Sequence, residues 1–121
     1  MLAARMAAHN VDCWLINTGW TGGKYGMSKR CPLRYTRAIV DAVHDGTLSR
    51  AQFEDFPVFN LRIPTAVKGV PREVLNPRLA WKDTDAFQRE LGKLAGMFRR
   101  AFAEYEKDVD VKIRDAGPQL S

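Results

Sequence analysis

The feature that most constrains the fold is an apolar run that leads directly into a glycine-rich, basic segment. The run covers Val11–Asn17 and is mostly apolar at successive positions, which predicts a strand buried on both faces. The next twelve residues, Thr18–Lys29, contain four glycines and predict a loop. Pro32 is suited to the first position of a helix, and Gly46 to a left-handed stop after Asp45. The chain is therefore expected to contain a strand–loop–helix unit.

The second strong pattern is a long amphipathic helix near the C-terminus. Apolar side chains recur at three- and four-residue steps from about Thr84 to Lys107, and Asp83 or Thr84 is expected to cap the helix. The remaining expected elements are helices over 2–9, 47–56 and 109–116, a helical turn near 73–75, and an edge strand over 56–63. Together these elements predict one mixed α/β domain, 1–121, with short buried strands and a long C-terminal helix.

The net charge of +5 is unevenly distributed. Residues 1–50 carry seven cations against three acids, whereas residues 51–121 carry twelve against eleven. A nucleic-acid interface usually presents a wider basic stripe with interleaved aromatic residues, so this concentration argues against nucleic acid as a partner. No apolar run approaches the roughly 18 residues of a membrane span, and the N-terminus is too polar for a secretory leader. A cytoplasmic protein with no membrane partner is expected.

The cations gather in and after the glycine-rich segment, without an acid among them. They are Lys24, Lys29, Arg30, Arg34 and Arg37. Such a cluster suits a polyanion, although neither the P-loop pattern nor the dinucleotide fingerprint is present. A flexible surface turn with solvated lysines remains an alternative of similar weight.

Three residues at the end of this segment are the candidate binding residues. Arg30 can stack on a base or pair with a phosphate, and Cys31 can offer its backbone groups. Thr36 shares the inward face of the following helix, so its hydroxyl is expected to be half-buried. Cys13 is expected in the core, and the two cysteines match no metal motif and require no disulfide. No catalytic set and no metal-ligand cluster is evident.

The same region resembles the C-terminal portion of ATP-dependent phosphoenolpyruvate carboxykinases. The resemblance rests on residues 14–23 (WLINTGWTGG), 25–26, 29–30 and 35–38, and then on 57–59, 63–65, 69–71 and 74–78 in the same order. It continues through Trp81 and the long helix to 116–118, and so covers nearly the whole chain. The family usually has glycine where this chain has Ser28.

The resemblance implies a piece of about the last quarter of an enzyme that converts oxaloacetate and ATP to phosphoenolpyruvate, carbon dioxide and ADP in gluconeogenesis. Arg30, Cys31 and Thr36 fall where the family contacts the adenosine side of ATP. The family's phosphate loop, divalent-metal (Mg or Mn) ligands, catalytic lysine and oxaloacetate-binding arginine have no counterpart here. The isolated chain is therefore expected to be inactive, with no catalytic and no metal-binding residues of its own.

The expected partners are a nucleotide and the remainder of the parent enzyme. One alternative is a stand-alone nucleotide-binding module that lacks the chemistry. Another is a non-catalytic interaction or structural domain, self-associating through apolar surface that the parent enzyme once covered.

Overall fold

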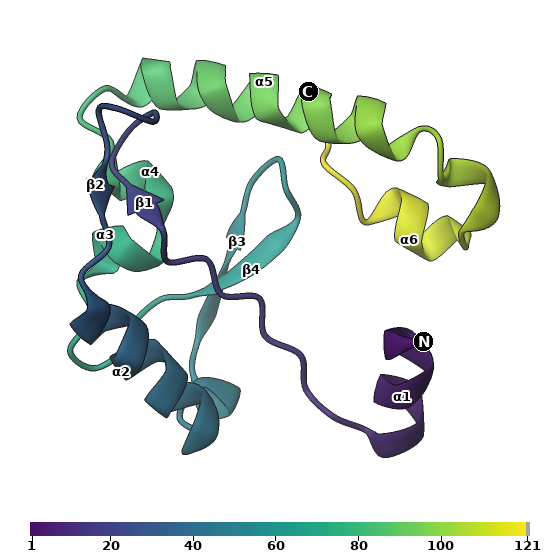
Figure 1. The fold of residues 1–121 in the computed structure, drawn as a ribbon, viewed down its shortest axis with the longest axis horizontal. Coiled ribbons are helices and arrows are strands. Elements are labelled where there is room, and N and C mark those ends of the chain that lie inside the picture. Colours follow the sequence, from purple (N-terminus) through teal and green to yellow (C-terminus); the bar gives the residue numbers. More distant parts are fainter. Residues whose placement is uncertain (121) are drawn as a thin grey trace.

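The computed structural model describes residues 1–120. This part of the chain forms helices and short two-stranded antiparallel sheets (Figure 1). The helices are α1 (Leu2–His9), α2 (Leu33–His44), α3 (Arg72–Leu75), α4 (Pro77–Ala80), α5 (Thr84–Phe102) and α6 (Val111–Asp115), with 3-10 turns η1 (Leu48–Arg50) and η2 (Glu106–Asp108). The strands are β1 (Trp20–Thr21), β2 (Lys29–Arg30), β3 (Phe53–Phe56) and β4 (Leu61–Pro64). The mixed α/β class expected from the sequence is confirmed at this coarse level.

The helix after the glycine-rich segment is α2, and it begins and ends close to the predicted residues. Pro32 immediately precedes it with φ −58°, and Gly46 follows it with φ 77°, in the left-handed region. The Gly46 N–H donates to the carbonyl of Val43 at 3.4 Å, which closes the C-terminal turn.

The single strand predicted over 56–63 is wrong, because the chain reverses in its middle. Strands β3 and β4 form an antiparallel hairpin that pairs Phe53 with Pro64 and Phe56 with Leu61. Val58 and Asn60 adopt positive φ values of 73° and 53° in the turn. The C-terminal tail fixes this turn, since the Gln119 N–H donates to the Val58 carbonyl at 2.7 Å and Asn60 Nδ2 to the Gly117 carbonyl at 3.0 Å.

The predicted helix over 47–56 is also wrong beyond its first residues. Only η1 forms, and the chain then extends into β3. The long helix α5 is confirmed, with the Asp83 carboxylate accepting from the Ala86 N–H at 2.9 Å as its N-cap. It ends at Phe102, about one turn earlier than predicted, and η2 follows after a turn.

Two separate apolar clusters form the interior. The first consists of Ala42, Leu48 and Val67, with Trp14 among the side chains packed on it. The second consists of Phe56, Phe87 and Leu91 between the hairpin and α5, with Phe59 and Trp81 at its margin. Phe87 meets Phe56 and Trp81 edge-on, at ring-centroid distances of 6.4 and 5.7 Å.

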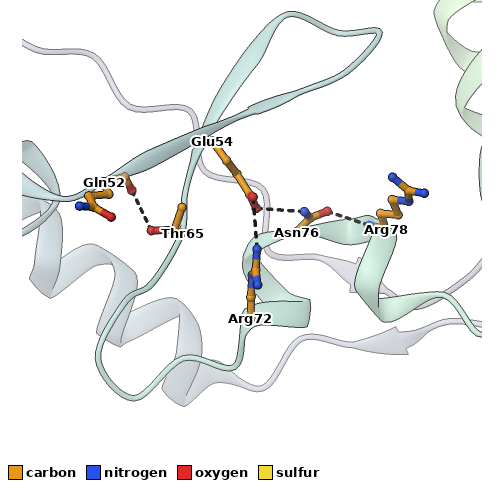
Figure 2. A network of polar contacts seen from close by, with 6 residues as sticks. All are labelled: Gln52, Glu54, Thr65, Arg72, Asn76 and Arg78. Carbon is orange, nitrogen blue, oxygen red and sulfur yellow. Dashed lines mark hydrogen bonds and ion pairs between the residues drawn. The ribbon is translucent and has the colours of Figure 1, made fainter.

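A polar network joins the hairpin to the short helices α3 and α4 (Figure 2). The Glu54 carboxylate accepts from Arg72 Nη2 at 3.3 Å and from Asn76 Nδ2 at 3.1 Å. Asn76 Oδ1 in turn accepts from the Arg78 N–H at 3.1 Å and so caps α4. One asparagine therefore links β3, α3 and α4.

The strand predicted over Val11–Asn17 is wrong, because residues 11–18 have no strand partner. They run as an extended segment across the hairpin (Figure 1), and none of their backbone groups forms a hydrogen bond within residues 1–120. Trp14 points inward and stacks on Phe53 at 6.0 Å, but Cys13 is exposed, so its predicted core position is wrong as well. The other side of this segment is exposed within the described residues, with Leu15 almost fully accessible.

Candidate functional site

The glycine-rich segment folds as a small antiparallel hairpin. Strands β1 and β2 pair Trp20 with Arg30 and Thr21 with Lys29. Gly22 has φ 87°, and a Cβ there would lie 3.2 Å from the Ala80 carbonyl, so a side chain at this position would be both strained and crowded. This close approach packs the β1–β2 hairpin against α4.

The three candidate binding residues lie at the junction of β2 and α2. Arg30 ends β2 with its side chain exposed, Cys31 is buried, and Thr36 is half-buried in the first turns of α2. The Cys31 N–H donates to the Gly19 carbonyl at 3.0 Å and the thiol to the Pro32 carbonyl at 3.9 Å, so the carbonyl of Cys31 is the backbone group left for a ligand. The half-buried position predicted for Thr36 is confirmed.

Two of the five cations have partners that the sequence did not reveal. Lys24 Nζ forms an ion pair with Glu90 Oε1 of α5 at 2.6 Å. The hydrogen bond from Lys24 lowers the pKa of the Glu90 carboxyl below its usual range, against a smaller opposing effect of burial. Arg34 lies over the Tyr35 ring, 4.8 Å from its centroid, and donates to the Tyr35 hydroxyl at 2.8 Å.

The other three cations are Lys29, Arg30 and Arg37, and none forms an ion pair within the described part of the chain. The β2–α2 junction thus keeps an uncompensated positive charge. That charge is what an anion-binding surface requires.

Two cavities lie between the β1–β2 hairpin and the region of α4. The larger, about 580 Å³, is lined by Trp81 and by charged residues of both signs, Lys24, Lys29, Lys82, Glu73 and Asp83, together with residues of the glycine-rich turn. The smaller, about 100 Å³, is lined by Cys31, Trp20 and Trp81. Arg30 and Thr36 line neither cavity. The fold therefore brings Cys31, but not the other two candidates, to these hollows.

The contribution of Trp81 and Lys82 was missed by the sequence reasoning. Both follow the Asn-Pro-Arg segment that supplied part of the family resemblance, about sixty residues after the glycines. Only that resemblance could have connected the two regions, because no local periodicity links them.

Ser28, which stands where the family usually has glycine, is poorly accommodated. Its Oγ is buried and is the one such side-chain oxygen or nitrogen of residues 1–120 without a hydrogen-bond partner. An unpaired buried hydroxyl is unfavourable, so this position next to β2 is a local weak point.

The part of the chain that the structure describes contains no group of three or more His, Cys, Asp or Glu side chains that could hold a metal ion. Within the same residues, every helix is too short or too polar to cross a membrane.

Comparison with known proteins identifies close relatives. The profile of a family described as phosphoenolpyruvate carboxykinase matches residues 1–73. Relatives named phosphoenolpyruvate carboxykinase (ATP) include one from Candida glabrata, 51% identical over 122 residues, and one from Bradyrhizobium diazoefficiens, 48% identical over 120 residues. A third, from Candida albicans, is 47% identical over 121 residues. The alignments cover 98–99% of this chain but only 22% of each relative, at its C-terminal end.

Proposed function

Because the chain belongs to the phosphoenolpyruvate carboxykinase family, we propose that it supplies the adenosine side of the ATP site of such an enzyme. The parent reaction converts oxaloacetate and ATP to phosphoenolpyruvate, carbon dioxide and ADP, a step of gluconeogenesis. The observation that carries the proposal is the 51% identity over 99% of the chain. The chain spans about a fifth of the length of that relative, so the complete activity requires the other part.

In this proposal each candidate residue has a distinct role. Arg30 contacts the base or the phosphates, since its guanidinium is exposed and has no acidic partner in the described residues. Cys31 contributes its carbonyl and thiol side chain, because its N–H is already bonded to Gly19. Thr36 holds the adenosine end through its half-buried hydroxyl. An exposed guanidinium near a half-buried hydroxyl supports this assignment, and the divalent metal that phosphoryl transfer needs would be held by the rest of the parent enzyme.

The isolated chain is expected to have no carboxykinase activity. Phosphoryl transfer depends on groups that cradle the phosphates and coordinate the metal, and the chain corresponds to only 22% of a complete relative. Oxaloacetate decarboxylation by the pure 121-residue protein would contradict this expectation.

The test of the nucleotide role is a chimera in which this chain replaces the matching C-terminal region of the Candida glabrata relative. In the active chimera, Arg30→Ala should raise the KM for ATP about 10- to 100-fold, the loss expected for a hydrogen bond to a charged group. The KM for oxaloacetate should stay unchanged. Arg100→Ala is the matched control, because it removes an exposed arginine near the C-terminal end of α5, outside the β2–α2 junction. An unchanged KM for ATP in the Arg30 variant would overturn the proposal.

The stand-alone nucleotide-binding module receives no support from the comparisons, in which the relatives reported are carboxykinases. A calorimetric titration of the isolated chain with ATP distinguishes the proposed half-pocket from a stand-alone module. Millimolar or weaker affinity for ATP is expected of half a pocket, whereas micromolar affinity abolished by Arg30→Ala would indicate a self-sufficient module.

A further inference from the structure

The C-terminal end of the chain folds back on α5. After α5 the chain reverses through η2, and α6 and the tail that follows it return toward the same helix (Figure 1). The Gln119 N–H donates to the Val58 carbonyl of the β3–β4 turn at 2.7 Å, and Gln119 Nε2 donates to the Gly117 carbonyl at 3.2 Å. The tail is therefore held in place by contacts within this chain.

A cavity of about 380 Å³ lies between α5, α6 and the tail. Its lining residues all fall between positions 98 and 119, so this short stretch of the chain builds it alone. Phe98, Phe102, Ile113 and Pro118 form its apolar wall. The Phe98 ring is fixed from behind by Phe59, which it meets edge-on at a centroid distance of 5.7 Å. The volume is within the range of small-molecule sites, about 300–1,000 Å³.

Charged side chains of both signs line the same cavity. Arg99 of α5 and Arg114 of α6 contribute guanidinium groups, whereas Glu106 of η2 and Asp115 of α6 contribute carboxylates. None of the four forms an ion pair within the described residues, and all four are exposed. An ion pair between two such exposed groups would gain little free energy, so the four charges are available to a ligand.

We propose that this cavity is a binding site for a small zwitterion with a bulky apolar side chain, the chemistry of a free aromatic amino acid. A guanidinium group binds the ligand carboxylate through two parallel hydrogen bonds, and the acidic side chains receive its ammonium group. The phenylalanine rings contact the apolar side chain. A dianion would meet Glu106 and Asp115, and a simple cation would meet the two arginines, so the lining disfavours both.

The site is separate from the one proposed for the nucleotide. Arg30, Cys31 and Thr36 do not line this cavity, and its walls come from the opposite end of the sequence. The proposal therefore goes beyond the nucleotide role and does not depend on it.

The test is an NMR titration of the isotope-labelled 121-residue chain with L-phenylalanine, without nucleotide. We expect saturable shifts of backbone amides between residues 98 and 119. At about ten times the dissociation constant, exchange of the Gln119 amide should slow about tenfold, because opening of the tail would require release of the ligand.

The matched variants are the adjacent arginines of α5. Arg99→Ala should weaken L-phenylalanine about tenfold or more, the loss expected for a hydrogen bond between charged groups. Arg100→Ala removes an equally charged neighbour that does not line the cavity, and should leave the affinity unchanged. In the same way, Arg114→Ala should weaken binding and Lys112→Ala should not.

Three analogues test the chemical class on the unsubstituted chain. Phenethylamine lacks the carboxylate, 3-phenylpropionate lacks the ammonium group and L-alanine lacks the ring. Each should bind about tenfold more weakly than L-phenylalanine, since each leaves one part of the lining unused.

The proposal fails if L-phenylalanine gives no saturable shifts, or if Arg99→Ala and Arg100→Ala bind it equally well. It also fails if any of the three analogues binds as tightly as L-phenylalanine. Because the analogues are compared on the unsubstituted chain, that comparison decides the matter even where a variant does not fold. No nucleotide is present, so failure of the nucleotide role would leave every one of these results unchanged.

Discussion

The N-terminal half of α5 and the segment of residues 11–18 both carry large apolar side chains, yet only the first has them enclosed. Phe87 and Leu91 are 6% and 7% exposed, because the hairpin and Trp81 cover them from within the same chain. Leu15, with no such cover, is 89% exposed. The difference shows that a hydrophobic pattern specifies that a face will be buried, but not which polypeptide will bury it.

Among the substitutions that test this comparison, the largest loss of stability is expected at Phe87. Truncation to alanine removes a buried ring that contacts Phe56 and Trp81, and should lower the free energy of unfolding by about 3 kcal/mol or more. Urea denaturation followed by tryptophan fluorescence measures the loss. Phe87→Leu keeps most of the apolar volume and is the milder control, so equal losses in the two variants would contradict the packing described here.

A smaller effect is expected at Asn76, whose side chain both donates to Glu54 and caps α4. Asn76→Ala should lower the free energy of unfolding by about 2 kcal/mol, since a partly buried hydrogen bond and a cap are lost together. Arg72→Ala is the control within the same network. Its pair with Glu54 is at the surface, 3.3 Å apart, and should contribute less than about 1 kcal/mol. A larger loss for Arg72→Ala would reverse this ranking.

The ion pair between Lys24 and Glu90 can be tested by measuring the pKa of Glu90. Its hydrogen bond lowers the pKa of Glu90, so its stabilising effect is present above the ordinary carboxyl pKa and is lost as pH falls through the lowered value. In Lys24→Ala the Glu90 pKa should return toward its usual range in an NMR titration. Lys93→Ala removes a lesser cause and should shift it less. An unmoved Glu90 pKa in Lys24→Ala would show that the glycine-rich hairpin is not tied to α5.

The smallest effect is expected at Leu15. In the free chain Leu15→Ala should change the free energy of unfolding by no more than about 0.5 kcal/mol, as for other exposed positions. Leu91→Ala, the same substitution at a buried site, should cost about 2–5 kcal/mol. Similar losses at both positions would remove the contrast between the two regions.

Several elements could be predicted from the sequence because their signals are local. Pro32 and Gly46 delimit α2, and Asp83 caps α5, each through its own backbone or side-chain chemistry. The hairpin of β3 and β4 could not be predicted in this way. Its turn contains Val58 at φ 73°, which a β-branched residue rarely adopts, and the tail at Gln119 holds it there from sixty residues away.

The candidate site was predictable only in part for the same reason. Arg30, Cys31 and Thr36 are close in sequence, so their shared place at the β2–α2 junction follows from local structure. The pairing of Lys24 with Glu90 and the nearness of Trp81 to the glycine-rich turn depend on tertiary packing. The adenosine-side role of these residues remains a prediction that rests on the family resemblance.

The division of the interior into two apolar clusters has a consequence for how the chain melts. The clusters share no buried side chain and each is small, and the contacts between them pass mainly through β3, so the folding of one stabilises the other only weakly. Heating the free chain should therefore give a broad, weakly cooperative transition, in which the calorimetric enthalpy exceeds the van't Hoff enthalpy. Amides near α5 and those near α2 should exchange through separate opening events.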